Sequence, residues 1–266
     1  METDMTTSFP PTWHEVFDVG CYWADLSGHL FPHAMLQMMQ ESAWKHAEAL
    51  RFGYSDLSRQ SLLWVLSRLT ADITRLPAWG ESVRLETWPT GTRRLFAMRE
   101  YCLYDENERE LLRANSAWLV LDAERRRPQK PGPIIEAQGI PLNPGNYNES
   151  PAKLDAVCPE SDLSDWRLDT ATYRVRYSDI DVQRHVNSAK YLEWMLDTLP
   201  DDWLIRYRPR TITINFLREC GIGDTLSISG YLKHNERDTR THHTARHDGD
   251  GKVACSVLAD WHPRES

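Results

Sequence analysis

The sequence pattern predicts the same order of elements twice, a long helix followed by several strands. This repetition limits the folds that the chain can adopt. In the first copy, apolar side chains recur at helical spacing across residues 32–50, which predicts a helix of about five turns. Apolar or alternating segments follow, separated by Gly, Pro, Asp and Asn, as expected for strands of an antiparallel meander. These segments are 62–66, 69–74, 83–88, 96–104 and 112–121.

The second half replays this order. A strand at 173–177 leads into a polar turn at 181–185 and then a helix expected over about 188–198. Further strands are predicted at 210–217, 225–232, 239–246 and 252–261. Two likenesses align the copies: the Asp25-x-x-x-His29 spacing recurs as Asp181-x-x-x-His185, and residues 70–83 resemble residues 213–226.

Each half contains a sheet that must bury one face. A long helix lying in a curled antiparallel sheet achieves this, and two such units can pair edge to edge. The intervening stretch is rich in Pro, Gly and Asn without sustained periodicity, which is typical of a linker. We therefore predict an α+β fold with an N-terminal domain over 10–127, a linker over 128–165 and a C-terminal domain over 166–263.

Composition excludes several classes of protein. With 266 residues, 41% of them hydrophobic, the chain can bury one large core or two ordinary ones. A net charge of −8 argues against a nucleic-acid binder, which would have to neutralise phosphates. The five scattered cysteines lack CxxC spacing, so neither a disulfide framework nor a zinc site is indicated.

The remaining patterns argue for a cytoplasmic protein without a cofactor. The first dozen residues show neither a signal peptide nor a transit segment, and no apolar run reaches the roughly 18 residues of a membrane span. Gly-rich phosphate loops are absent. His242, His243 and His247 lack a convincing metal-ligand spacing, so we expect no nucleotide, flavin or metal.

Four motifs then occur in order along the chain, at residues 79–89, 96–101, 178–194 and 218–221. Together they resemble the acyl-[acyl carrier protein] thioesterases of plants and bacteria, over residues 13 to 262. The resemblance implies a tandem pair of hotdog domains and release of free fatty acid from acyl carrier protein. Without a transit peptide in view, the bacterial members are the closer likeness.

Thioester hydrolysis needs a base or nucleophile, donors for the developing oxyanion and a dry tunnel for the acyl chain. Glu219 is the predicted general base for water, although a Glu at a strand end is often only a surface residue. The neighbouring Cys220 is either a nucleophile activated by His185 or a small buried hydrophobe. We favour Glu219 with water.

The polar turn offers further candidates. His185 precedes the N-terminal amides of a helix, where oxyanion binding or substrate orientation is plausible beside a merely structural role. Asp181 either orients His185 or Gln183, or caps the turn. Gln183 departs from the family, which usually carries Asn in its Asp-x-Asn-x-His motif. The extra methylene leaves three outcomes open: slower hydrolysis, a different substrate range, or acyl binding without efficient turnover.

The first half is expected to supply the acyl pocket. Leu76 and Pro77 occupy the positions that match Glu219 and Cys220, and neither can act as base or nucleophile, so one site per chain follows. A Met and aromatic set is the candidate lining, with plain core as the alternative. Its members are Met35, Met38, Met39, Trp64, Trp88 and Phe96.

Arg206, Arg208 and Arg210 are candidates for receiving the acidic carrier protein or the phosphate of its phosphopantetheine arm, with a solvated loop as the alternative. Two other functions stay open at this stage. One is an acyl-CoA thioesterase on the same fold, and the other is a non-catalytic acyl-binding module. A monomer suffices because the chain already holds both domains, and a homodimer is the alternative.

Overall fold

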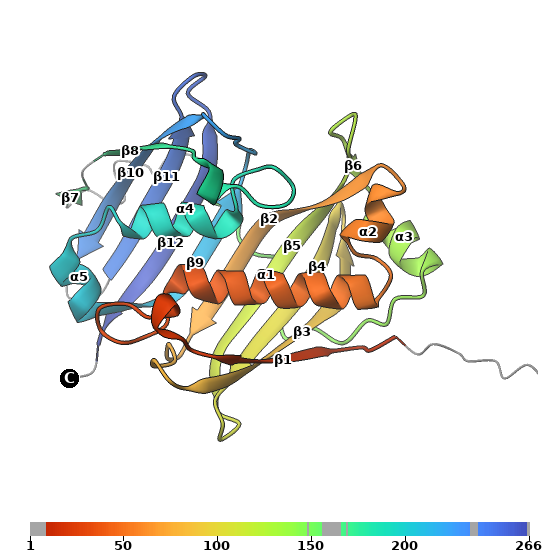
Figure 1. Ribbon diagram of the computed structural model, residues 1–266, viewed down its shortest axis with the longest axis horizontal. Coiled ribbons are helices and arrows are strands. Elements are labelled where there is room, and N and C mark those ends of the chain that lie inside the picture. Colours follow the sequence, from red (N-terminus) through yellow and green to blue (C-terminus); the bar gives the residue numbers. More distant parts are fainter. Residues whose placement is uncertain (1–8, 148, 156–165, 169, 235–238, 265–266) are drawn as a thin grey trace, which may run out of the picture.

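The computed structural model describes residues 9–147, 149–155, 166–168, 170–234 and 239–264. The described strands form one 12-stranded antiparallel sheet, with the main order β1-β3-β4-β5-β2-β9-β12-β11-β10-β7 (Figure 1). The first half contributes β1 (Trp13–Asp18), β2 (Leu62–Ile73), β3 (Ser82–Arg93), β4 (Phe96–Tyr104), β5 (Glu110–Asp122) and β6 (Pro128–Gln129). The second half contributes β7 (Trp166–Arg167), β8 (Ala171–Arg174), β9 (Tyr207–Phe216), β10 (Thr225–His234), β11 (Thr239–His247) and β12 (Val253–Pro263).

Two long helices lie side by side on the same face of this sheet (Figure 1). Helix α1 (Pro32–Ala49) begins with a proline. The N–H groups at the start of a helix have no acceptor within it, so a proline, which lacks this group, is well tolerated there. Helix α4 (Ser188–Leu196) is capped by Asn187, whose Oδ1 accepts a hydrogen bond of 2.9 Å from the backbone N–H of Ala189. Each helix buries its apolar face against its own half of the sheet, which confirms the predicted pair of hotdog units.

The two halves join through β2 and β9. Their pairing runs antiparallel from Arg68 opposite Asn215 to Asp72 opposite Thr211, and the hydroxyls of Thr70 and Thr213 lie 3.1 Å apart across it. Edge-to-edge pairing was expected from the sequence. It satisfies the backbone groups of two strands that would otherwise be open edges.

The internal repeat extends to single hydrogen bonds. The backbone N–H of Asp25 donates to the carbonyl of His29 at 2.7 Å, and that of Asp181 donates to the carbonyl of His185 at 2.9 Å. Each turn is then tied to the residue after the matching strand, because Leu30 donates to the Pro77 carbonyl and Val186 donates to the Cys220 carbonyl, both at 2.8 Å. Leu76 therefore holds the place of Glu219.

Some elements differ from the sequence prediction. Segments 62–66 and 69–74 belong to the single strand β2, and the break in their alternation is a shift of register between Leu66 and Arg68. Strand β1 and three short helices were not predicted, since a few residues give little periodicity to recognise. These helices are α2 (Tyr54–Ser58), α3 (Pro131–Ala137) and α5 (Asp201–Arg206).

The proline-rich segment after β5 is held against the sheet. Its first part forms α3, and two carboxylate oxygens of the buried Glu100 accept hydrogen bonds from the backbone N–H groups of Asn146 and Tyr147 at 2.8 and 3.1 Å. Residues 148 and 156–165 of the expected linker, including Cys158, lie outside the described residues. The domain boundaries proposed above stay a prediction.

Two global properties follow from the described residues. None of their helices is long and apolar enough to cross a membrane. The cysteines among them, Cys21, Cys102, Cys220 and Cys255, are free thiols.

We expect Asn215→Ala to destabilise the fold. The fully buried side chain of Asn215 accepts from the Leu154 N–H at 3.0 Å and donates to the Ala152 carbonyl at 2.9 Å. Its loss leaves both backbone groups without a partner, at a cost of about 1–3 kcal/mol. Urea unfolding measures this cost. The exposed Asn107→Ala is the control, and equal midpoints for the two variants would contradict the prediction.

We expect stability to fall on acidification between about pH 6.5 and pH 4. Burial lowers the pKa of His243 to about 3, and burial together with Arg99 lowers the pKa of His46 to about 4. Both rings therefore stay neutral in the folded protein while the unfolded chain binds protons below about 6.5, so their contribution is complete above that pH and is lost as pH falls through the folded pKa. Thermal unfolding from pH 7 to pH 4 measures the loss.

The variant His243→Gln should flatten this pH dependence, because its side chain does not titrate. The exposed His262→Gln serves as the control. An unchanged slope in His243→Gln would show that other groups cause the acid sensitivity.

Candidate active site

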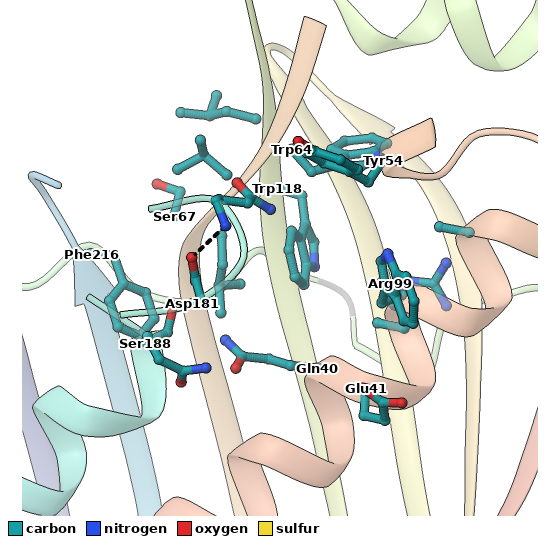
Figure 2. Close-up of a pocket in the computed structure, with 18 of the residues that line it drawn as sticks. Gln40, Glu41, Tyr54, Trp64, Ser67, Arg99, Trp118, Asp181, Ser188 and Phe216 are labelled. Carbon is teal, nitrogen blue, oxygen red and sulfur yellow. Dashed lines mark hydrogen bonds between the residues drawn. The ribbon is translucent and has the colours of Figure 1, made fainter. Parts of the chain in front are cut away.

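A cavity of about 950 Å³ lies between α1, the sheet and the polar turn that precedes α4 (Figure 2). Figure 2 shows Trp64 and Trp118, from β2 and β5, across the cavity from Asp181 and Ser188. Most of its apolar wall comes from the first half of the chain, including Met38, Phe52, Trp64, Trp118, Ile135 and Ile140. The cavity therefore joins the two halves, with an apolar chamber in the first and a polar edge in the second.

The polar edge brings together most of the predicted catalytic residues. Asp181, Gln183 and His185 reach the cavity from the turn, and Glu219 reaches it from the segment after β9. The Nε2 atom of His185 lies 3.4 Å from Oε2 of Glu219. Both side chains are partly exposed, at 28% and 31%, so a water molecule has access to them.

Asp181 holds the turn in shape. Its Oδ1 accepts a hydrogen bond of 2.8 Å from the backbone N–H of Gln183, drawn as the dashed line in Figure 2. The turn closes where Ile180 and Val186 pair as an isolated bridge. This is the capping role of Asp, and it aims the side chains of Gln183 and His185 at the cavity.

Arg126 also belongs to this site, although it comes from the other half of the chain. Its Nη2 lies 2.8 Å from Oε2 of Glu219, and its Nη1 donates to Oε1 at 3.2 Å. The same Nη2 lies 3.3 Å from Nε2 of His185. In the sequence, Arg126 is one of three consecutive arginines, Arg125 to Arg127, and no local pattern singles it out. Arg264, directly after β12, makes a comparable contact with the turn of the first half.

Cys220 faces away from the site. Its side chain is 2% exposed and lies outside the cavity wall formed by the described residues. Burial raises the pKa of the thiol, which favours the neutral form over the nucleophilic thiolate. Glu219 and Cys220 are therefore neighbours in the chain, but only Glu219 lines the cavity.

The predicted pocket residues divide into two groups. Met38 and Trp64 line the cavity. Met35, Met39 and Trp88 are buried beyond it, at 2%, 1% and 8% exposure, and Phe96 packs under the guanidinium of Arg68 at 5.2 Å. Helix phase and strand alternation decide this division, because the side chains of one helix or strand face different surfaces.

The three predicted carrier-binding arginines lie far from Glu219. They stand at the N-terminal end of β9 and in α5, whereas Glu219 follows the C-terminal end of β9; a ten-residue strand spans roughly 30 Å. Their side chains have local partners: Arg206 pairs with Asp202, Arg208 donates to the Thr74 carbonyl at 2.7 Å, and Arg210 lies 3.3 Å from Nε2 of His262. Within the described chain, no group of three His, Cys, Asp or Glu side chains is arranged to hold a metal ion.

Two solved structures share this architecture. An acyl-ACP thioesterase from Bacteroides thetaiotaomicron superposes with a TM-score of 0.80 at 24% identity, covering 95% of this chain and 98% of the other. The 12:0-ACP thioesterase from Umbellularia californica gives 0.83 at 20% identity, covering 96% and 98%. At these identities the likeness establishes the fold.

Sequence comparison reaches plant proteins. A chloroplastic oleoyl-acyl carrier protein thioesterase from Coriandrum sativum is 26% identical over 230 residues, which is 81% of this chain and 61% of the relative. Oleoyl-acyl carrier protein thioesterase 1 from Arabidopsis thaliana is 24% identical over 283 residues, 96% of this chain and 77% of the relative. The chain thus spans about three fifths of the coriander protein.

The family comparison covers most of the chain in two consecutive parts. The acyl-ACP thioesterase N-terminal domain matches residues 10–135, and the acyl-ACP thioesterase C-terminal domain matches residues 165–263. The matches keep the order of the two halves seen in the structure. The chain belongs to the acyl-ACP thioesterase family.

Proposed function

We propose that the protein hydrolyses fatty acyl-[acyl carrier protein] to free fatty acid and carrier protein. The observation that carries this proposal is the cavity in which a large apolar chamber meets Glu219, His185 and Gln183. An alkyl chain gains free energy by leaving water for such a chamber. Its thioester would then lie at the polar edge, where a base and hydrogen-bond donors converge. Family membership supports the same substrate class.

Glu219 is the proposed general base. As the oxygen of a water molecule bonds to the thioester carbonyl carbon, one of the water protons passes to the Glu219 carboxylate. The carbon–sulfur bond then breaks, and the departing thiolate takes that proton. The products are the fatty acid and the free thiol of the carrier, and Glu219 returns to its ionised state.

The turn and the start of α4 are the proposed donors for the oxyanion. The cavity is lined by Gln183, Asn187 and Ser188, and the first N–H groups of a helix have no partner within it. The N–H groups of Ala189 and Lys190 already donate to Asn187. The Ser188 N–H and the Gln183 side chain are therefore the proposed donors to the negative oxygen that forms on the carbonyl. His185 beside Glu219 is placed to orient the water or the leaving sulfur.

The carrier arm is proposed to enter beside the turn. A smaller cleft of about 200 Å³ shares Tyr54, Arg126 and His185 with the main cavity and extends to Arg184. The turn is open to solvent here, since Val182 is 86% exposed. A cationic side chain at this opening suits the phosphate of a phosphopantetheine arm, which is common to acyl carrier protein and coenzyme A.

We expect Glu219→Gln to lower kcat/KM for acyl carrier protein thioesters by about 100- to 10,000-fold, because the amide cannot take a proton from water. Paired assays with carrier protein and coenzyme A thioesters of the same acyl chain measure both turnover and carrier preference. The control is Glu108→Gln, an exposed carboxylate in the β4–β5 turn. Wild-type turnover in folded Glu219→Gln would exclude this residue as the base. Higher kcat/KM with coenzyme A would instead identify an acyl-CoA thioesterase.

We expect Met38→Ala to shift the preference toward longer acyl chains, since it enlarges the cavity that Met38 lines. Met39→Ala on the same helix is the matched control: it removes a buried core side chain and should cost about 2–5 kcal/mol of stability without moving the preference. A chain-length panel and thermal unfolding of both variants provide the comparison. Equal chain-length profiles for the two variants would place the acyl chain elsewhere.

A further inference from the structure

The turn after β5 is built to present one arginine to the other half of the chain. Oδ1 of Asp122 accepts from the backbone N–H groups of Glu124 and Arg125 at 3.1 and 2.8 Å, and the Asp122 carbonyl accepts from the Arg126 N–H at 2.9 Å. Arg126 itself has a φ of 53°. This left-handed conformation is unfavourable for a residue other than glycine, and such strain often accompanies functional positions.

The contacts of Arg126 constrain both partners. The Nη1 and Nη2 atoms face the two oxygens of the Glu219 carboxylate at 3.2 and 2.8 Å, a forked arrangement that fixes the orientation of the carboxylate plane. Nη2 also points at Nε2 of His185 from 3.3 Å. A guanidinium only donates, so this contact favours a ring with the lone pair on Nε2 and the proton on Nδ1.

The first half of the chain provides an internal comparison. Arg264, which follows β12, reaches the matching turn there: its Nη2 donates to Oδ2 of Asp25 at 2.6 Å, and its Nη1 lies 3.2 Å from Nδ1 of His29. Leu76 stands where the second half has Glu219, so a carboxylate is missing at that position. The arginine pairs with the turn aspartate instead. Each turn is thus contacted by an arginine from the opposite half. The residue at the position of Glu219 or Leu76 determines which carboxylate that arginine pairs with.

We propose that Arg126 is a positioning residue of the hydrolytic site, which orients the Glu219 carboxylate and selects the ring form of His185. This inference rests on the proposed function. Other charged groups near the site are engaged locally or point to solvent: Arg218 pairs with Asp250, Asp181 caps its own turn, and Arg184 is exposed. Arg126 is the cation in direct contact with Glu219 among the described residues.

A split between kcat and KM, with partial rescue by lysine, distinguishes positioning from simple structural support. We expect Arg126→Met to lower kcat by about 10- to 100-fold with KM within about twofold of the wild type, because the carboxylate remains but loses its fixed orientation. Arg126→Lys should recover only part of kcat, because lysine supplies the charge without the fork.

Arg264→Met is the matched control. It removes the arginine that follows β12 and makes the comparable contact with the turn of the first half, and it should lower the melting temperature while leaving kcat unchanged. Wild-type kcat in folded Arg126→Met, or an equal loss of kcat in Arg264→Met, would overturn the proposal.

A measurement without turnover separates this inference from the proposed function. Long-range ¹H–¹⁵N spectra of the histidine rings report which nitrogen of His185 carries the proton. The wild type should show the proton on Nδ1, and Arg126→Met should shift the population toward Nε2, where it can donate to Glu219. Should the wild type hydrolyse no thioester, the proposed function fails while this spectral change still supports the contact. Identical spectra for the two proteins would overturn the role of Arg126 whatever the activity.

Discussion

The pairing of β2 with β9 is the interaction on which the rest of the structure depends. Five residue pairs, from Arg68–Asn215 to Asp72–Thr211, turn two half-molecules into one sheet. With the sheet continuous, α1 and α4 must lie beside one another on its face, and the turn before α4 comes to rest over a chamber walled by the first half. Neither half encloses this cavity alone. The proposed chemistry is therefore a property of the joined sheet.

The two halves share a scaffold, and the asymmetry of the site comes from a few side chains that differ between them. Both halves keep the Asp-to-His turn, the hydrogen bond that ties it to the residues after the matching strand, and an arginine arriving from the opposite half. They differ at Glu219 and Leu76, where a partly exposed carboxylate in one half corresponds to a 2% exposed leucine in the other. The turns also differ, with Gln183 in the second half at the position of Ser27 in the first. The scaffold is shared, and the chemistry resides in a few side chains.

The sequence predicted the repeat and its helix-and-strand halves because these depend on local spacing and periodicity, and the resemblance to a known family supplied the hotdog fold. Neither source indicates the direction in which each side chain points. Met35 and Met39 share a helix with Met38, yet only Met38 reaches the cavity. Cys220 adjoins Glu219 and faces the core, and Arg206, Arg208 and Arg210 lie one strand length from the site they were expected to serve. Arg126 escaped notice because its partners are 59 and 93 residues away, beyond any local pattern.

The division of the cavity between the two halves bears on the choice of acyl chain. The residues proposed to break the thioester lie mainly on the C-terminal half, while most of the apolar wall of the cavity comes from the N-terminal half. Substitutions at Met38, Phe52 or Trp118 would change the depth and shape of the chamber without touching Glu219 or His185. Under the proposed function, the preferred acyl chain can therefore change through substitutions in one half while the hydrolytic residues of the other half stay the same.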